Sequence, residues 1–230
     1  MGKVEDIGRA VSRVADGMTV MVGGFMGCGN PHSVIDALID AGTTNLTLIC
    51  NDASSPGYGV AKLVEQKRVT KLVATHVGLN PEVARQMNAG ELEVELIPQG
   101  TFAECIRAAG AGLGGVLTPT GLGTPVAEGK PTVEVDGRTY LLEKPIRADV
   151  ALIAGNRVDE SGNIWYKGTT RSFSPLMALA ADTVIVEADH LLEVGDLYPE
   201  DVVTPGCLVD HIVVSTHSED DFNSKLGYPE

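Results

Sequence analysis

A glycine-rich loop between an apolar strand and a helix is the feature that most constrains this chain. Residues 18–22 form an apolar run typical of a buried strand, and the loop after it carries Gly23, Gly24, Gly27 and Gly29. The loop ends at Pro31, and proline suits the first turn of a helix, where the N–H group that it lacks would have no partner. Glycine lets the backbone bend sharply and approach a ligand closely. Because N–H groups beside a helix N-terminus bind anions, the loop predicts a site for phosphate or carboxylate groups.

Short apolar runs alternate with helical patterns along most of the chain. The runs at residues 46–50 and 71–75 are almost continuously apolar, as in parallel strands buried on both faces. Further strands are expected at residues 94–97, 150–154, 183–187 and 212–215. Helices are expected at residues 4–15, 33–40, 59–66, 81–88, 103–109 and 173–181. This alternation predicts an α/β fold, an open and mostly parallel sheet flanked by helices.

A second pattern interrupts this alternation in the middle of the chain. Residues 132–142 alternate in polarity on both sides of Asp136 and Gly137, which predicts a β-hairpin with a tight turn. We therefore expect one domain over residues 1–216, with a hairpin insertion at about residues 131–143 and a polar tail at residues 217–230. Residues 110–115 match G-x-G-x-x-G, but they follow a helical pattern and not a strand, so we interpret them as a helix stop and a loop.

Charge and composition exclude several classes of protein. The formal net charge is −14 and no basic run is present, which argues against nucleic-acid binding. No apolar run is long enough to span a membrane, and the N-terminus lacks a secretory signal, so we expect a cytoplasmic protein without membrane contact. The four cysteines have no C-x-x-C or Cys/His spacing, which argues for reduced thiols and against a metal site.

Polar residues that follow the expected strands are the candidates for chemistry. Gln99 comes after the strand at residues 94–97, where its amide could donate a hydrogen bond to an oxyanion or simply face solvent. Asn51 follows the strand at residues 46–50 and could position a substrate or cap a helix. Gly121 and Gly123 form a second glycine turn, near a ligand or merely leading into the hairpin.

Residue patterns do not single out a nucleophile. His76 is the most site-like of five dispersed histidines, although a structural role is the more common one for such a residue. Three acidic residues could be considered as nucleophiles, namely Glu104, Glu128 and Glu143. None of them stands in a sequence context that distinguishes it from a solvated surface charge.

Residues 16–31 as a whole resemble the signature of the first subunit of the family I CoA-transferases. That signature is Asp/Asn-Gly, two residues, three apolar residues, Gly-Gly-Phe, three residues, Gly, one residue and Pro, and this chain matches it from Asp16 to Pro31. The likeness extends over residues 4–215 and is greatest to the A (alpha) subunits of acetate/butyrate–acetoacetate CoA-transferases. One departure is that Ser172 and Ser174 stand where such subunits carry asparagine.

The resemblance implies an enzyme that is active only with a B (beta) subunit, in an α₂β₂ assembly. CoA would move between acetyl-, butyryl- or acetoacetyl-CoA and a carboxylate such as acetoacetate, acetate or butyrate, through a glutamyl-CoA intermediate. The nucleophilic glutamate would lie in a Ser-Glu-Asn-Gly segment of the B subunit, and this chain contains no such segment. Coenzyme A would be a substrate, with no permanently bound cofactor.

The resemblance also assigns residues. Gln99 would stabilise the oxyanion, and the glycine loop would bind coenzyme A through Gly23, Gly24, Phe25, Met26, Gly27, Cys28 and Gly29. Two alternatives remain open at this point, a sugar-phosphate isomerase of similar fold and a sensor of acyl-CoA or sugar phosphates. The first would need its own acid/base carboxylate and a phosphate clamp, and it should be active without a partner.

Overall fold

An open sheet of eight strands forms the centre of the computed structural model, which describes residues 2–217. Seven strands pair in parallel, in the order β11-β10-β8-β1-β2-β3-β4, and the eighth, β9, pairs antiparallel with β8. Their bounds are β1 Thr19–Val22, β2 Leu46–Cys50, β3 Val69–Ala74, β4 Glu93–Leu96, β8 Ala148–Asp159, β9 Ile164–Trp165, β10 Ala181–Leu192 and β11 His211–Val214. The expected open, mostly parallel sheet is confirmed.

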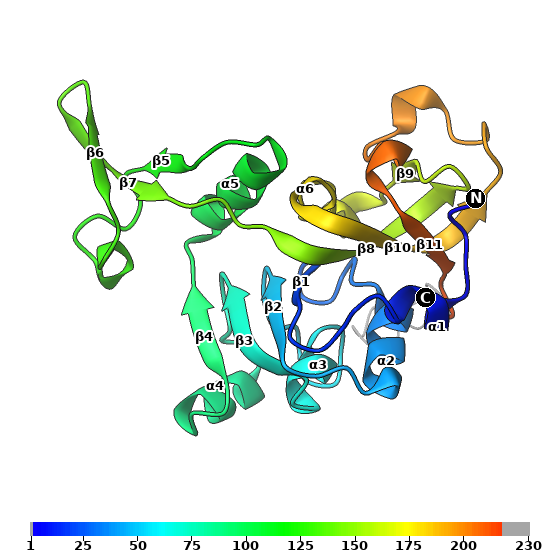
Figure 1. Cartoon of the computed structure of the whole chain (residues 1–230), viewed down its shortest axis with the longest axis horizontal. Helices are drawn as coiled ribbons and strands as arrows, with labels where there is room; N and C mark the ends of the chain where they lie inside the picture. The colour runs from blue at the N-terminus through cyan, green and yellow to red at the C-terminus, as the bar shows by residue number, and fades with distance from the viewer. Residues whose placement is uncertain (1, 218–230) are drawn as a thin grey trace.

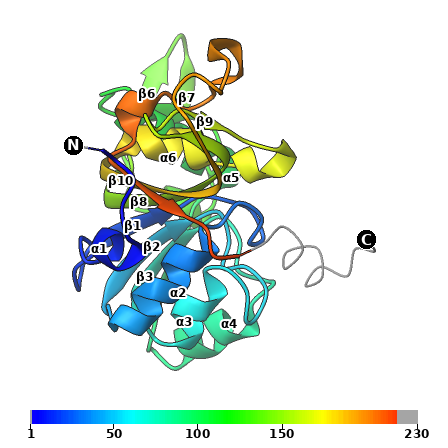
Figure 2. The ribbon, with the colours of Figure 1, turned by 90° about the vertical axis from the view of Figure 1, so that its right-hand side faces the viewer.

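Helices cover both faces of this sheet. On one face lie α1 (Ile7–Val11), α2 (His32–Ala41), α3 (Ala61–Glu65) and α4 (Pro81–Asn88), and on the other lie α5 (Gln99–Gly110) and α6 (Ser174–Ala180), as Figure 1 and Figure 2 show. Alternate side chains of β1 point to opposite faces: Val20 and Val22 join the apolar core under α1 to α4, and Met21 joins the core under α5 and α6. Burial on both sides explains why the parallel strands are so uniformly apolar.

A smaller antiparallel sheet projects from this body (Figure 1). It consists of β5 (Val116–Thr118), β6 (Thr132–Val135) and β7 (Arg138–Glu143), in the order β5-β7-β6. Asp136 and Gly137 both have positive φ, 50° and 71°, as the tight hairpin turn requires. The expected hairpin is confirmed, but the strand β5 was not expected, because its three residues follow a glycine-rich stretch that hides their pattern.

Several boundaries differ from those expected. The opening helix is shorter than residues 4–15, because Val4 pairs with Ile212 and extends the edge of the sheet instead. The fifth helix begins at Gln99, four residues before the expected start, and the Phe102 N–H already donates to the Pro98 carbonyl at 2.8 Å. Pro31 precedes helix α2, which starts at His32.

The remaining ordered turns are short 3₁₀ helices. They are η1 Pro125–Ala127, η2 Gly168–Arg171, η3 Pro199–Asp201 and η4 Gly206–Leu208. Of the expected polar tail only its first residue, His217, is among the described residues, and residues 218–230 lie outside them. Within residues 2–217, no helix combines the length and apolar character needed to cross a membrane.

Candidate active site

The glycine loop between β1 and α2 is a tight turn held on both sides by the body of the protein. Phe25 and Cys28 exchange both backbone hydrogen bonds at 2.9 Å, and Met26 and Gly27 at the tip have φ of 50° and 83°. The Gly24 N–H donates to the Ser172 carbonyl at 3.0 Å. Among the described residues the N–H groups of Gly27 and Gly29 find no acceptor, so they are available to a ligand.

The glycines of this loop are required by the protein's own packing. A Cβ atom on any of the four would meet a neighbouring residue: Ser174 for Gly23, Asn30 for Gly24, Tyr58 for Gly27 and Thr170 for Gly29. At Gly24 and Gly29 the nearest atoms would be 2.6 Å away, closer than any real Cβ contact. In the structure these glycines let neighbouring protein segments approach closely, and the close approach of a ligand that the sequence suggested stays a prediction.

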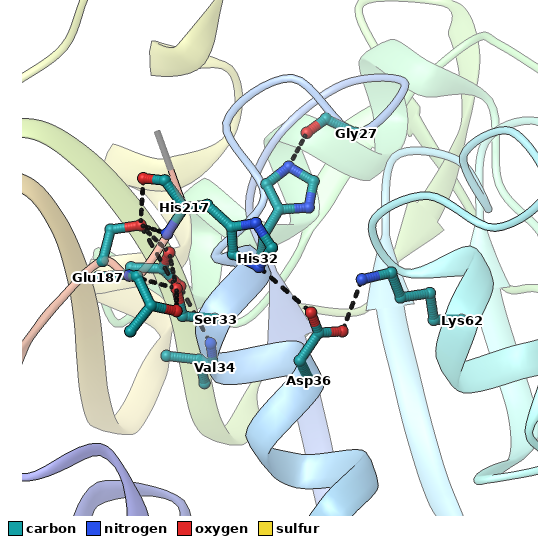
Figure 3. Close-up of polar contacts among 10 residues, drawn as sticks. Gly27, His32, Ser33, Val34, Asp36, Lys62, Glu187 and His217 are labelled. Carbon is teal, nitrogen blue, oxygen red and sulfur yellow. Dashed lines mark hydrogen bonds and ion pairs between the residues drawn. The ribbon is translucent and has the colours of Figure 1, made fainter. Parts of the chain in front are cut away.

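The N-terminus of α2, which the sequence suggested as an anion site, is filled by the chain's own carboxylate. Glu187 of β10 is 2% exposed and accepts hydrogen bonds from the Val34 N–H at 3.0 Å and the Ser33 hydroxyl at 2.8 Å (Figure 3). Ser215 donates to the same carboxylate at 2.6 Å. A negative charge at a helix N-terminus is favourable, so Glu187 stabilises the helix and takes the place of a ligand anion at these donors.

Gln99 and Asn51 lie together at the carboxyl ends of β4 and β2. The Gln99 Nε2 donates to Asn51 Oδ1 at 2.7 Å, and Asn51 Nδ2 donates to Asp52 Oδ2 at 2.8 Å. The same Asp52 oxygen accepts the Met26 N–H of the glycine loop at 2.9 Å. Asn51 and Asp52 are buried, at 1% and 4% exposure, while Gln99 is exposed. One chain of hydrogen bonds thus joins the glycine loop to the exposed Gln99 amide.

His32 supports the loop from below, although the sequence drew attention to His76 instead. The His32 Nε2 lies 3.1 Å from the Gly27 carbonyl, and its ring centroid is 4.5 Å from that of Tyr58. Burial lowers the pKa of His32 to about 4, and the charges of His217 and Lys62 act in the same direction. The ring is therefore neutral at pH 7, with its proton on Nε2 donated to Gly27. The position of His32 directly after Pro31, where the glycine loop ends, is the sequence signal that could have identified it as a residue of this site.

A network of charged residues holds the C-terminal end of the described chain against α2 (Figure 3). The Asp36 carboxylate accepts from Lys62 Nζ at 2.6 Å and lies 3.2 Å from His217 Nε2. The Thr216 N–H donates to the Ser33 hydroxyl at 2.9 Å. These contacts fix the helix that follows the loop.

Two hollows flank the glycine loop. The first has a volume of about 290 Å³ and is lined by Cys28, Gly29 and His32 on the loop side and by Asn156, Glu187 and Asp189 from the strands β8 and β10. The second, more open hollow lies beside Phe25, Arg171 and Ser172. Phe25 is 42% exposed there and Arg171 supplies a cation, a combination suited to an apolar ligand segment and a phosphate.

The remaining candidates are placed as follows. The Cys28 Sγ lies 3.2 Å from the Thr169 hydroxyl beside the first hollow. Gly121 and Gly123 lie in the loop after β5, where Gly121 packs against Val126, and they line neither hollow. The acidic candidates are tied to other charges or exposed: Glu104 bonds to Arg107, Glu143 bonds to Lys130, and Glu128 is exposed.

Ser172 and Ser174, which stand where similar subunits carry asparagine, differ in their contacts. Ser172 contacts the glycine loop through its backbone carbonyl, which any residue provides. The hydroxyl of Ser174 is buried against Gly23 and has no hydrogen-bond partner among the described residues.

Comparison with known proteins shows the family of this chain. The family model described as Coenzyme A transferase matches residues 4–215. The chain is 53% identical to the acetate CoA-transferase subunit alpha of Escherichia coli (strain K12), over 89% of this chain and 93% of that protein. It is 52% identical to the acetoacetyl-CoA:acetate/butyrate CoA transferase alpha subunit of Clostridium acetobutylicum, over 86% of this chain and 91% of that protein.

Solved structures show the same fold. An acyl-CoA transferase from Escherichia coli O157:H7, in a thioester complex with CoA, superposes with a TM-score of 0.84 at 24% identity, over 93% of this chain and 47% of that chain. Glutaconate coenzyme A-transferase from Acidaminococcus fermentans gives a TM-score of 0.83 at 17% identity, over 93% of this chain and 75% of that one. With the family model covering nearly all the described residues, this chain belongs to the coenzyme A transferase family.

Proposed function

We propose that this chain is the alpha subunit of a transferase that moves coenzyme A between a short-chain acyl-CoA and a free carboxylate. Acetate, butyrate and acetoacetate are the substrates that we assign, because relatives at 53% and 52% identity are named for them. The observation that carries the proposal is the exposed Gln99 amide, held by Asn51 beside the glycine loop of a coenzyme A transferase fold.

The chemistry calls for a carboxylate nucleophile and an oxyanion donor. A glutamate carboxylate attacks the thioester carbonyl carbon, and the carbonyl oxygen becomes an oxyanion that accepts the free N–H of Gln99. Collapse expels the CoA thiolate and leaves an acyl-glutamyl anhydride. The thiolate then attacks the glutamyl carbonyl, releases the first carboxylate and forms a glutamyl-CoA thioester, from which an acceptor carboxylate takes the CoA by the reverse steps.

The nucleophile in this proposal comes from a partner beta subunit. Asp52 is the carboxylate joined to Gln99 through hydrogen bonds, but it accepts from Met26, Asn51 and Ser54 and is buried, so it is poorly placed to attack a thioester. Relatives named as alpha subunits support the existence of a second kind of subunit. We assign the nucleophile to a Ser-Glu-Asn-Gly segment of that subunit, and the assembly to an α₂β₂ enzyme in the cytoplasm.

Coenzyme A itself, as substrate, would lie along the glycine loop. Phe25 offers an exposed ring beside Arg171, and the N–H groups of Gly27 and Gly29 offer two donors. Oriented donors and one cation can bind an acidic ligand although the whole chain carries a net charge of −14, because the field is set locally.

The test is loss of acetoacetyl-CoA absorbance with acetate or butyrate as acceptor. The chain is assayed alone and after co-purification with the product of the adjacent reading frame, tested as the beta subunit, and activity is expected only in the mixture. Changing Gln99→Ala should lower turnover by about 10²-fold while assembly is unchanged. Gln66→Ala is the matched control, since Gln66 is exposed at the end of α3. Activity of the chain alone, or equal turnover of both variants, would contradict the proposal.

A further inference from the structure

The orientation of the Asn51 amide is set by the carboxylate of Asp52. An ionised carboxylate only accepts hydrogen bonds, whereas an amide has a donating and an accepting end of nearly equal size. Asp52 Oδ2 lies 2.8 Å from Asn51, so the NH₂ group of Asn51 must face it. The Asn51 Oδ1 therefore faces the opposite way, toward Gln99.

The orientation of Gln99 follows from that of Asn51. The Asn51 Oδ1 only accepts, so the NH₂ group of Gln99 lies against it at 2.7 Å and the Gln99 carbonyl points away. The Thr75 hydroxyl also touches Asn51 Oδ1 at 3.2 Å, but a hydroxyl can rotate to donate or accept and would tolerate either amide orientation. Of these three neighbours, the group that can adopt only one role is the Asp52 carboxylate.

We infer that Asp52 is a positioning residue that fixes where the free N–H of Gln99 points, an inference that rests on the proposed function. The same Asp52 oxygen holds the Met26 N–H at 2.9 Å, so one buried carboxylate anchors both the glycine loop and the amide pair. The other oxygen accepts the Ser54 N–H at 2.8 Å and keeps the carboxylate in place. An oxyanion donor that is oriented before the reaction stabilises the transition state without reorganisation.

Asp52→Asn tests the inference, because it keeps the size of the side chain but replaces a group that only accepts hydrogen bonds by one that also donates them. The new NH₂ group takes the place of one carboxylate oxygen and faces either the Ser54 N–H or the Met26 and Asn51 donors. The orientation of the amide pair is then no longer fixed, and whenever the NH₂ group faces Asn51, the amides of Asn51 and Gln99 both turn over and the Gln99 carbonyl replaces its N–H against Asn51. We expect kcat to fall by about tenfold and KM to stay within about twofold, a smaller loss than for removal of the Gln99 donor.

Asp159→Asn is the matched control. Asp159 is 1% exposed and, like Asp52, its carboxylate accepts several hydrogen bonds, here from Ser161 and Asn163. In the described part of the chain it shares no hydrogen bond with Asn51 or Gln99. Its variant should therefore lower the melting temperature as Asp52→Asn does, with kcat within about twofold of the parent.

A double-mutant cycle with Gln99→Ala separates positioning from general damage. In the assembled enzyme, Asp52→Asn should add less than about twofold to the loss caused by Gln99→Ala, because both act through one donor. An additive loss, an effect confined to KM, or an effect equal to that of Asp159→Asn would overturn the inference. If Asp52→Asn does not assemble, Asn51→Ala enters the same cycle with the same expectation. Failure of the proposed function is distinguishable, since the parent enzyme would then lack activity or Gln99→Ala would keep it.

Discussion

The change Gly27→Ala distinguishes a glycine needed for packing from one needed for a ligand. Gly27 has φ of +83°, and an added Cβ would overlap the Cδ1 and Cε1 atoms of the Tyr58 ring. That ring is 8% exposed and packs against His32, so it cannot turn out of the way without disturbing the loop support. The change should therefore destabilise the protein in the absence of any substrate.

The magnitude can be worked out in two parts. A left-handed φ costs alanine about 1–2 kcal/mol relative to glycine, and the reduced freedom of the unfolded chain offsets about 0.4–1 kcal/mol of it. Displacement of a well-packed ring adds about 1–3 kcal/mol. Gly57→Ala is the control, because Gly57 has φ of +73° and open space around its Cα. The difference between the two variants, about 1–3 kcal/mol, isolates the contact with Tyr58.

Urea unfolding of the two variants and the parent protein measures this difference directly. Equal m-values would show that the same surface is exposed in each, so the midpoints report the free energy of unfolding. If Gly27→Ala is no less stable than Gly57→Ala, the Tyr58 ring yields freely and the packing explanation is wrong. In that case a loss of transferase activity by Gly27→Ala with full stability would return the glycine to the role that the sequence suggested, close approach of a ligand.

Two further predictions concern charge. His32 has a folded pKa of about 4, below its ordinary 6.5, so as the pH falls the unfolded chain takes up the proton first. The folded state should therefore lose about 2 kcal/mol of stability between about pH 7.5 and about pH 5. His32→Gln should remove this part of the pH dependence of urea unfolding. Lys130→Met should lower the free energy of unfolding by about 2–4 kcal/mol, because it leaves the Glu143 carboxylate, 6% exposed, without the cation 2.7 Å away. The double variant Lys130→Met with Glu143→Leu should recover most of the melting temperature in calorimetry.

The sheet was predictable from the sequence because parallel strands buried on both faces appear as nearly continuous apolar runs. Leu46–Cys50 was predicted with its observed bounds, and so was the helix Pro81–Asn88, whose Asn80 caps it by accepting the Glu82 N–H at 3.1 Å. Residues 3–5 were less predictable: their apolar Val4 fits a helix, but pairing with Ile212 decides their conformation, and that partner is over 200 residues away.

The candidate site was predictable in its parts but not in its connections. Gln99 and Asn51 were both singled out because each follows a strand, yet nothing in the sequence tells that they share a hydrogen bond or that Asp52 orients them. The helix after this strand was expected over residues 103–109, whereas Pro98 directly precedes it and Gln99 is its first residue. Glu187 gave no signal, because a carboxylate inside an apolar strand is informative only once its partners Ser33 and Val34 are known.

A shared active site gives these internal contacts their functional meaning. If the nucleophile comes from another subunit, donors that this chain already holds in place spare the association of the two subunits the free energy of ordering them. The glycine loop packs on Tyr58 and Thr170, and Asp52 ties the loop to the Gln99 amide, so the alpha half is ordered by contacts within one chain. Substitutions inside this network should thus lower turnover more than they weaken assembly, whereas substitutions at the subunit interface should do the reverse.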